Sequence, residues 1–407
     1  MPPLHRPVGP LAGVRIVEMS SFIATPLSGL VLGQLGAEVI RVEQIGGAPD
    51  RTRLPRAAGG TSLYWSGLNK GKRALAVDLT QQDGRDLVAD LIVGEGAGTA
   101  GGIVVSNSER YRDLSFEGLR ERRTDLIHVV LTGRRDGSSA VDYTIQAGTG
   151  FPAVSGPAGS SAPVNSTIPA WDLAAGLYLA TGLLAAERER SRTGMGQQVR
   201  LPLEDVALSL IGAMGFLTEA QLVGISRGPS GNDVYGTYGR DFVTADGVRF
   251  MMVVLTGSHW RRLLEVTGMV DAMAAVEKAL DVDLSDEAER YRCRTVISAL
   301  LEKRFAALSW EDVDALLAQA RVLVSPYRTF DQLVHSDLVR ANPLFNEVDQ
   351  PGVGPHLAAG SPLIMGERHC SAVPAPRVGE HTDEILSDLL GIEAERLGAL
   401  HDAGVIA

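Results

Sequence analysis

The 407-residue sequence contains little cysteine and few aromatic residues, which make up 5% of the chain. Its two cysteines, Cys293 and Cys370, stand far apart, and no Cys-x-x-Cys or His/Cys spacing typical of zinc sites is present. We therefore expect reduced thiols and no metal. No apolar run reaches about 18 residues without charge or proline, so we expect no membrane span. The proline-rich start lacks an apolar segment, so we expect no signal peptide and predict a soluble, cytoplasmic protein.

Positive charge is also scarce. The formal net charge is -11 and the sequence pI is about 5.3. A general nucleic-acid binder should present a basic face, so we expect no nucleic-acid partner. A small anionic ligand remains compatible with this composition, because a local basic cluster suffices. With 45% hydrophobic residues, the chain can bury a sizeable core, and its length predicts two or three domains.

The first half of the chain alternates between strand and helix patterns. Apolar runs predict strands over residues 14–19, 38–43, 74–78, 102–106 and 126–132. Pro26 suits the first turn of a helix that runs to about residue 36, and a second helix is expected over 83–92. Such a βαβ pattern predicts an α/β fold with a parallel sheet covered by helices.

The rest of the chain predicts a long helix from residue 172 to about 190, a strand over 198–202 and a helix over 204–222. The composition then changes, and we expect a small domain over 226–321 with a hairpin at 242–255. Its predicted helices cover residues 259–280, 287–307 and 310–320. Residues 322–376 look loop-like, before a final helix from about residue 382. The predicted domains are therefore 1–225, 226–321 and 322–407, the last a linker that returns to the first.

Asp172 is the candidate catalytic residue. It follows Pro169-Ala170-Trp171 at the start of a long apolar helix. Unpaired N–H groups and the helix dipole are expected to favour its ionised form there. A carboxylate kept ionised in apolar surroundings is a plausible nucleophile toward an activated acyl group. The alternative is that Asp172 merely caps the helix, a position that Asp favours.

Two basic segments are candidate anion sites. Lys70, Lys72 and Arg73 lie in a short loop that leads into a strand, and could hold phosphate by charge-assisted hydrogen bonds. Arg134 and Arg135 follow a predicted strand, where ligands gather in open α/β sheets, and could hold a carboxylate. The alternative for each segment is a solvated surface turn. The first strand-to-helix turn contains no glycine, so a dinucleotide site there is not expected.

Several segments, in conserved order along the chain, carry a resemblance to a known family. They are residues 9–18, LGAEVIRVE at 35–43, NKGKRALAVDL at 69–79, the helix after Asp172, TGMGQQV at 193–199 and GEHTDEIL at 379–386. Together they resemble the family III CoA-transferases. The resemblance implies a Rossmann-like large domain formed by both chain ends, a smaller inserted α+β domain and an interlocked homodimer. It also implies that the catalytic group is Asp172.

The resemblance further implies a double displacement on an acyl-CoA, with CoA as part of the substrate and no other cofactor. Asp172 would form an aspartyl–acyl anhydride and then an aspartyl-CoA thioester. The predicted CoA-binding residues are Arg41, Lys70, Lys72, Arg73 and Asn107. The predicted substrate-binding residues are Arg134, Arg135 and Asp142. The loop that borders CoA in many members reads Asn-Phe-x-Pro-Gly, and only its first residue, Asn107, carries over.

Within the family, strings such as GLNKGKR at 67–73 and PAWD at 169–172 resemble the enzymes that move CoA between C1 and C4 of mesaconate. One alternative is transfer of CoA between two different acids. A second is a 2-methylacyl-CoA racemase, but its relatives place a His where this chain has Val141. A third is a CoA-ester binding protein without catalysis.

Overall fold

The computed structural model describes residues 9–94, 101–224 and 227–407, and these form two compact units. The first unit contains the residues up to Thr149, Ser166–Gln221 and Val339–Ala407. The second contains Gly150–Asn165 and Leu222–Leu338. The first unit therefore draws on both ends of the chain. The predicted boundary between residues 225 and 226 falls outside the described residues.

A six-stranded parallel sheet forms the centre of the first unit. Its strands are β1 (Arg15–Met19), β2 (Glu38–Glu43), β3 (Arg73–Ala76), β4 (Ile103–Ser106), β5 (Ile127–Thr132) and β6 (Gln197–Pro202). They are arranged in the order β3-β2-β1-β4-β5-β6, the order of Rossmann-type sheets. The predicted α/β fold with a parallel sheet is confirmed.

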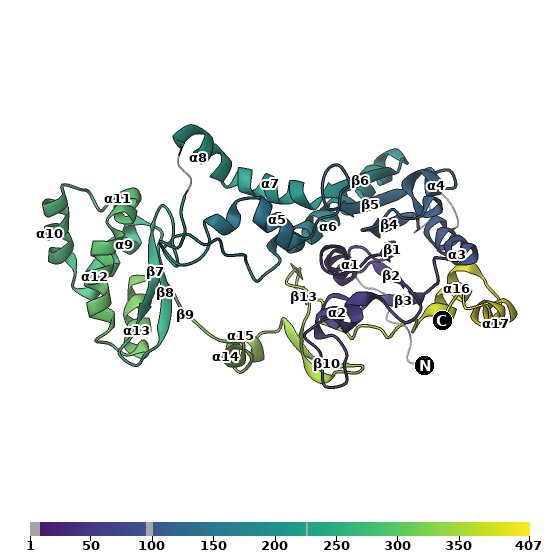
Figure 1. The fold of residues 1–407 in the computed structure, drawn as a ribbon. Coiled ribbons are helices and arrows are strands. Elements are labelled where there is room, and N and C mark those ends of the chain that lie inside the picture. Colours follow the sequence, from purple (N-terminus) through teal and green to yellow (C-terminus); the bar gives the residue numbers. More distant parts are fainter. Residues whose placement is uncertain (1–8, 95–100, 225–226) are drawn as a thin grey trace. The chain divides into compact units, whose positions relative to one another are not determined.

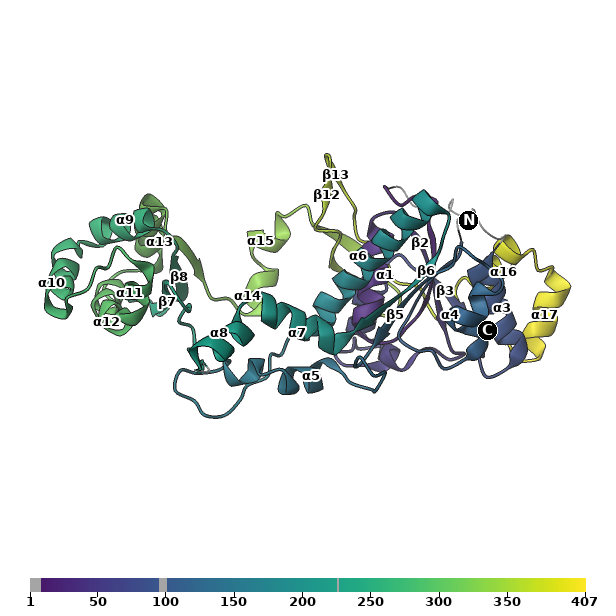
Figure 2. The same ribbon diagram turned by 90° about the horizontal axis from the view of Figure 1, so that it is seen from above.

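Helices cover both faces of this sheet (Figure 2). On one face lie α1 (Ala24–Gln34) and α6 (Ala170–Thr193). On the other lie α3 (Gln82–Val93), α4 (Phe116–Arg120) and α16 (Thr382–Leu390), which is followed by α17 (Ala394–Asp402). The core includes Val17, Leu75, Val104 and Ile385, all at most 1% exposed, so strands from the first half and a helix from the chain's end share one core. Full burial of each such side chain contributes about 1.5–3 kcal/mol.

Small residues bring α1 and α6 close together. A Cβ on Gly176 of α6 would lie 2.8 Å from the carbonyl oxygen of Ala24 and 3.0 Å from the Cβ of Leu27. No larger residue fits without moving one helix, because backbone atoms cannot give way as a flexible side chain can. This contact fixes the start of α6, and with it Asp172, against the first turn of α1.

Further helices of the first unit are α2 (Leu63–Leu68), α5 (Asp142–Gly148) and α7 (Leu203–Ala213). The single helix predicted over 204–222 is two, because Gly215, at φ +80°, ends α7 before α8 (Phe216–Val223) begins. Among the described residues, no helix alone is long and apolar enough to cross a bilayer; α7 and α8 pass that test only together, across a 60° bend.

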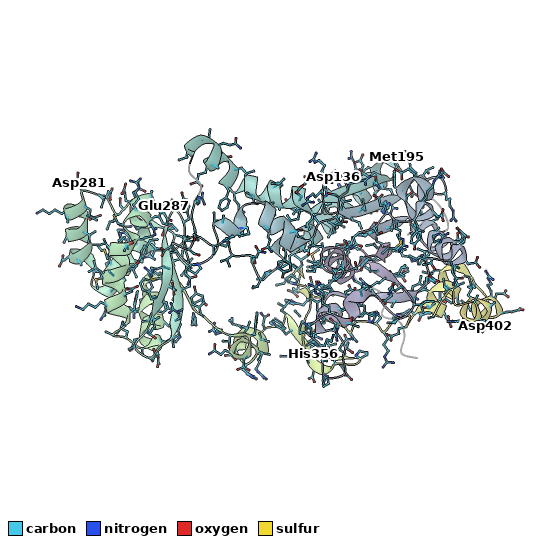
Figure 3. The ribbon with its side chains drawn as sticks, viewed as in Figure 1. Asp136, Met195, Asp281, Glu287, His356 and Asp402 are labelled. Carbon is cyan, nitrogen blue, oxygen red and sulfur yellow. The ribbon has the colours of Figure 1, made fainter. Side chains whose placement is uncertain are left out.

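The second unit contains a three-stranded antiparallel sheet packed against helices (Figure 1). The strands are β7 (Tyr238–Val243), β8 (Arg249–Val254) and β9 (Leu323–Pro326), and the predicted hairpin is confirmed. The helices are α9 (Gly257–Thr267), α10 (Val270–Leu280), α11 (Glu287–Arg292), α12 (Arg294–Phe305) and α13 (Trp310–Ala320). The helix predicted over residues 259–280 is two helices, α9 and α10, because the left-handed Gly268 ends α9. The helix predicted over residues 287–307 is likewise two, α11 and α12. Asp281, labelled in Figure 3, is the left-handed residue that ends α10.

The prediction that residues 322–376 form a loop is wrong. Besides β9, this stretch contains α14 (Phe330–Val334), α15 (Asp337–Arg340), β10 (Phe345–Gln350), β11 (Gly354–Ala359), β12 (Ile364–Met365) and β13 (Arg368–His369). β10 and β11 pair as an antiparallel hairpin. The prolines and glycines that suggested a loop form its turn, where Gly352 has φ +74°.

Candidate active site

A cavity of about 280 Å³ lies at the carboxyl ends of β1, β4 and β5, within the first unit. Its walls are residues 21–24, 131–133 and 140–143, together with Arg53, Asn107, Asp172 and Leu203. In the strand order of this sheet, β1 and β4 are the neighbours from which the chain departs in opposite directions. Open α/β sheets bind ligands at that position. The cavity is therefore the candidate active site, and it contains the predicted catalytic residue.

Asp172 is the third residue of α6 and is half-buried on the cavity wall. It is not the N-cap: that position is Pro169, whose side chain makes no capping hydrogen bond. The side chain that accepts the N–H groups of the first turn belongs to Asp142. Its Oδ2 accepts hydrogen bonds from the backbone N–H of Trp171 at 2.8 Å and of Asp172 at 3.0 Å. The alternative in which Asp172 merely caps its helix is wrong.

Asp142 is held in this position by its own helix. It is 2% exposed and begins α5, where its Oδ1 accepts a hydrogen bond from the side-chain amide of Gln146. The Oε1 of Gln146 accepts the backbone N–H of Ser166 at 2.8 Å, a few residues before α6. Asp142 and Gln146 thus connect the start of α5 to the start of α6.

The pKa of Asp172 is raised from 3.8 to about 7. Burial is the largest cause, the negative charge of Asp142 adds to it, and Arg53 opposes it. The expectation that the helix terminus favours the ionised form is therefore wrong in sign. The main reason is that burial disfavours the charged carboxylate, and Asp142, which already accepts the N–H groups of the first turn, adds a like charge beside it.

Arg53 reaches the same cavity from the loop after β2. Its guanidinium carbon lies 5.4 Å from the centre of the Phe22 ring and 5.1 Å from that of Tyr64, within cation–π range. No carboxylate lies within ion-pair distance of it in the part of the chain that the structure describes. The hydroxyl of Tyr64 is buried, has no hydrogen-bond partner among the described residues, and burial raises its pKa.

A buried ionic network supports the Phe22 loop from beneath. The Nζ of Lys72 lies 2.8 Å from Glu18, and Arg41 bridges Glu18 and Asp50 at 3.1 and 3.3 Å. Asp50 in turn accepts the backbone N–H of Phe22 at 2.8 Å, and Phe22 is left-handed at φ +64°. Burial lowers the pKa of Lys72 to about 8, while Glu18 opposes that shift. The network thus holds an unfavourable backbone conformation at the cavity wall.

A second cavity, of about 340 Å³, adjoins the first along the same edge of the sheet. Its walls are residues 19–21, 42–44 and 77–80, together with Ala48, Pro49, Asn107, Ser108, Arg110, Tyr111 and Leu114. Ser21 and Asn107 line both cavities. The side-chain amide of Asn107 donates to the carbonyl oxygen of Ser21 at 3.1 Å, which joins the loops after β1 and β4. Ser21 and Asn107 therefore lie at the border between the two cavities.

Of the five predicted CoA-binding residues, only Asn107 lines these cavities. Arg41 and Lys72 are at most 3% exposed and belong to the ionic network. Lys70 donates to the carbonyl oxygen of Gly67 at 3.0 Å. Arg73 begins β3, so it lies at the opposite, amino edge of the sheet, paired with Glu38 at 2.6 Å and with Glu384 at 2.7 Å. Contact of these four residues with CoA stays a prediction.

Arg134 and Arg135 lie in the turn after β5, marked in Figure 3 by their neighbour Asp136. Arg134 pairs with Glu204 at 3.2 Å and Arg135 with Asp205 at 2.7 Å, both at the start of α7. Neither arginine is part of the cavity wall around Asp172, although Gly133 is. Asp142, the third predicted substrate residue, is on that wall.

Arg53, Phe22 and Tyr64 are site residues that the sequence did not single out. Arg53 is on an irregular loop with several other arginines, so no local pattern separates it from Arg51 or Arg56. Arg51 pairs with Glu43 and is thereby engaged elsewhere. The described residues contain no group of three or more His, Cys, Asp or Glu arranged to hold a metal ion.

Comparison with known proteins finds relatives of this chain. The chain is 44% identical to the 2-methylfumaryl-CoA isomerase of Chloroflexus aurantiacus, over 98% of both chains. It is 27% identical to the succinyl-CoA:mesaconate CoA-transferase of Haloarcula hispanica, over 94% of this chain and 96% of that one.

Among solved structures, a CaiB/BaiF family protein from Brucella suis shares the fold. Its TM-score is 0.76 at 24% identity, over 94% of this chain and 99% of that one. The pattern that defines CoA-transferase family III matches residues 11–382. The cavity with its helix-borne aspartate thus occurs in a chain that matches one enzyme family almost from end to end. The chain belongs to CoA-transferase family III.

Proposed function

We propose that this protein is a 2-methylfumaryl-CoA isomerase, which transfers CoA between the C1 and C4 carboxyl groups of mesaconate. The observation that carries the proposal is the position of Asp172, a half-buried carboxylate on the wall of a small cavity, at the start of its helix. The 44% identity with the Chloroflexus aurantiacus isomerase over 98% of both chains supports this substrate.

In the proposed reaction, a carboxylate oxygen of Asp172 attacks the C1 thioester carbonyl and expels CoA as its thiolate. This gives an aspartyl–acyl anhydride. The thiolate then attacks the aspartyl carbonyl, which releases the acid as a carboxylate and leaves an aspartyl-CoA thioester. The C4 carboxylate of the retained acid attacks this thioester, which forms a second anhydride and releases the CoA thiolate. The thiolate then attacks the C4 acyl carbonyl, which gives the C4 ester and frees the Asp172 carboxylate. Two easier displacements thereby replace one direct exchange.

The environment of Asp172 suits a nucleophile. Its pKa of about 7 leaves a substantial ionised fraction at neutral pH, on a more basic oxygen than an ordinary aspartate offers. The N–H groups of Trp171 and Asp172 already donate to Asp142, so they are not free to stabilise an oxyanion in this arrangement. In this proposal, Asp142 supports the start of the helix that carries Asp172, in place of the substrate contact predicted for it.

We place the nucleotide part of CoA in the second cavity and the thioester near Asn107. The second cavity opens at the carboxyl ends of β1 to β4, where nucleotides bind in such sheets. Arg110 and Tyr111 line it, and Arg110 lies 5.2 Å from the Tyr111 ring centre. Asn107 lines both cavities, so a ligand passing from one to the other would contact it. Binding of CoA by Arg41, Lys70, Lys72 and Arg73 is retained as a prediction.

We also propose that the chain forms an interlocked homodimer with its smaller domain inserted in the larger. Both chain ends contribute to the first unit, which supports the insertion. Leu173, Leu177 and Tyr178 of α6 are 37%, 54% and 44% exposed. Exposed apolar side chains gathered along one helix indicate a surface that a partner covers. Light scattering on the purified protein would test the dimer, and a monomer at working concentration would contradict it.

The test is incubation with mesaconyl-C1-CoA in the presence of isotopically labelled free mesaconate. Mass spectrometry should find the C4 ester without label, and an aspartyl hydroxamate at Asp172 after quenching with hydroxylamine, which cleaves the aspartyl-CoA thioester and releases CoA. Asp172→Asn should form neither. Label in the product would instead show transfer between separate acids, as in the name of the Haloarcula hispanica relative. Absence of both turnover and adduct in the native protein would contradict enzymatic function altogether.

A further inference from the structure

The proposed reaction requires a second binding group besides the nucleophile. While one carboxyl carbon of a dicarboxylic acid reacts at Asp172, the other end carries a negative charge inside the cavity. That charge needs a cation with free hydrogen-bond donors, since an unpaired buried carboxylate is costly. The cation must also keep its place while the acid turns, so its own side chain should be held by contacts that do not use its donors.

Among the described residues on the cavity wall, Arg53 is the one cation. Its guanidinium lies 5.4 Å from the Phe22 ring centre and 5.1 Å from that of Tyr64. Contacts with ring faces restrain a guanidinium without consuming its N–H groups. No ion-pair partner is present for Arg53 among the described residues, so the N–H groups of its planar guanidinium remain available to a carboxylate.

Three other arginines considered for substrate or CoA are already engaged in ion pairs. Arg134 and Arg135 pair with Glu204 and Asp205 and lie off the cavity wall. Arg41 is fully buried between Glu18 and Asp50. Use of any of these by a substrate would require an ion pair to break. Arg53 requires no such change.

We propose that Arg53 binds the non-reacting carboxylate of the acyl group and thereby selects dicarboxylic over monocarboxylic acyl-CoA esters. The inference rests on the proposed function, because it assumes a dicarboxylic acid at Asp172. Phe22 and Tyr64 serve as positioning residues that hold the guanidinium toward the cavity. The loop that follows β2 thus sets the acid specificity, while α6 supplies the nucleophile.

The test measures binding in an Asp172→Asn background, where no turnover occurs and the charge of Asp172 is absent. Calorimetry compares succinyl-CoA with butyryl-CoA, which share a four-carbon acyl chain and differ in the terminal carboxylate. Adding Arg53→Gln should weaken succinyl-CoA binding by about 10- to 100-fold, the effect of losing a charge-assisted pair. Butyryl-CoA binding should change by less than about threefold. Arg53→Lys should give an intermediate loss, because charge remains without the fork.

Arg56→Gln is the matched control, since Arg56 is on the same loop but not on the cavity wall. Arg134→Gln and Arg135→Gln should also leave the preference for succinyl-CoA intact. Equal weakening of both esters by Arg53→Gln would overturn the inference, as would loss of the preference in Arg134→Gln or Arg135→Gln. Since this comparison needs no isomerisation, a protein that prefers succinyl-CoA through Arg53 but fails to isomerise mesaconyl-CoA would contradict the proposed function alone.

Discussion

Asp142 accepts the backbone N–H of Asp172, with Oδ2 3.0 Å from the nitrogen, so one acid fixes the main chain of the other. The same carboxylate raises the pKa of the Asp172 side chain through charge repulsion. Asp142 therefore affects both the position and the protonation of the proposed nucleophile, without itself being required to touch substrate.

The Asp142→Asn variant separates these two effects. An asparagine oxygen can still accept the N–H groups of Trp171 and Asp172, but the negative charge is gone. We expect the acidic limb of the kcat/KM profile to move to lower pH, with activity at pH 6 relative to its plateau rising about 2- to 5-fold. Gln146 would lose its ionised acceptor, at a cost in stability of about 1–2 kcal/mol. Asp402→Asn, on an exposed helix end, is the control. If the acidic limb of the kcat/KM profile does not move in Asp142→Asn, this role of Asp142 is contradicted.

The native enzyme should itself show a simple pH dependence. Attack requires ionised Asp172, and its pKa is about 7 in the free protein. We expect kcat/KM to be half-maximal near pH 7 and to fall about tenfold for each further unit of acidification. The profile is measured with initial rates between pH 5 and 9. Constant activity from pH 5 to 8 would show that Asp172 has an ordinary aspartate pKa.

Removal of the Asp172 charge should stabilise the folded protein at alkaline pH. The folded-state pKa is above the unfolded value of 3.8, so the folded state binds the proton more tightly. The free energy of unfolding therefore falls as pH rises from about 4 to 7, because the buried carboxyl of Asp172 must then ionise. Asp172→Asn should be more stable than the native protein by roughly 2–4 kcal/mol at pH 8, with little difference at pH 4. Urea unfolding at both values measures this, and a gain independent of pH would contradict it.

The sheet could be predicted from the sequence because buried parallel strands are near-continuous apolar runs, as in β4 and β5. Helix breaks were harder to predict. Gly215 and Gly268 interrupt patterns that are otherwise helical, and a single glycine does not reveal whether it adopts a left-handed conformation. The hairpin of β10 and β11 was missed because its turn is rich in proline and glycine, which also mark loops.

Only part of the candidate site could be predicted, because only some of its residues are marked by their neighbours in the sequence. Asp172 could be found from its place at a helix start, but its pKa depends on Asp142, which is brought close only by the fold. Arg73 is the first residue of β3, and the start of a parallel strand lies at the edge of the sheet opposite the ligand cavities. The position of Arg73 before the apolar run of that strand therefore indicated that it lies away from the cavities. No comparable signal marks Arg53, whose place depends on the ring of Phe22, which only the fold brings beside it.

Substitution of Phe22 should reduce activity while changing stability little. Its φ of +64° is costly for a residue with a Cβ, by about 1–2 kcal/mol, whereas glycine adopts it freely. Phe22→Gly relieves that strain and removes the ring beside Arg53. We expect the free energy of unfolding to change by less than about 1 kcal/mol while kcat/KM falls about tenfold. Phe22→Leu, which keeps the strain and loses the ring, should lose activity similarly. Unchanged activity in both variants would show that the ring does not position Arg53.

Gly176 tests whether the contact between α1 and α6 positions the nucleophile. A Cβ there would lie 2.8 Å from the carbonyl oxygen of Ala24, which is backbone and cannot turn aside. We expect Gly176→Ala to reduce the free energy of unfolding by about 1–3 kcal/mol. We also expect kcat to fall, because α6 must move and it carries Asp172. Gly398 lies within α17 with no atom inside 4 Å of an added Cβ, so Gly398→Ala should instead stabilise by about 0.5–1 kcal/mol. If both variants behave alike in unfolding and kcat assays, the close packing of α1 on α6 does not set the position of Asp172.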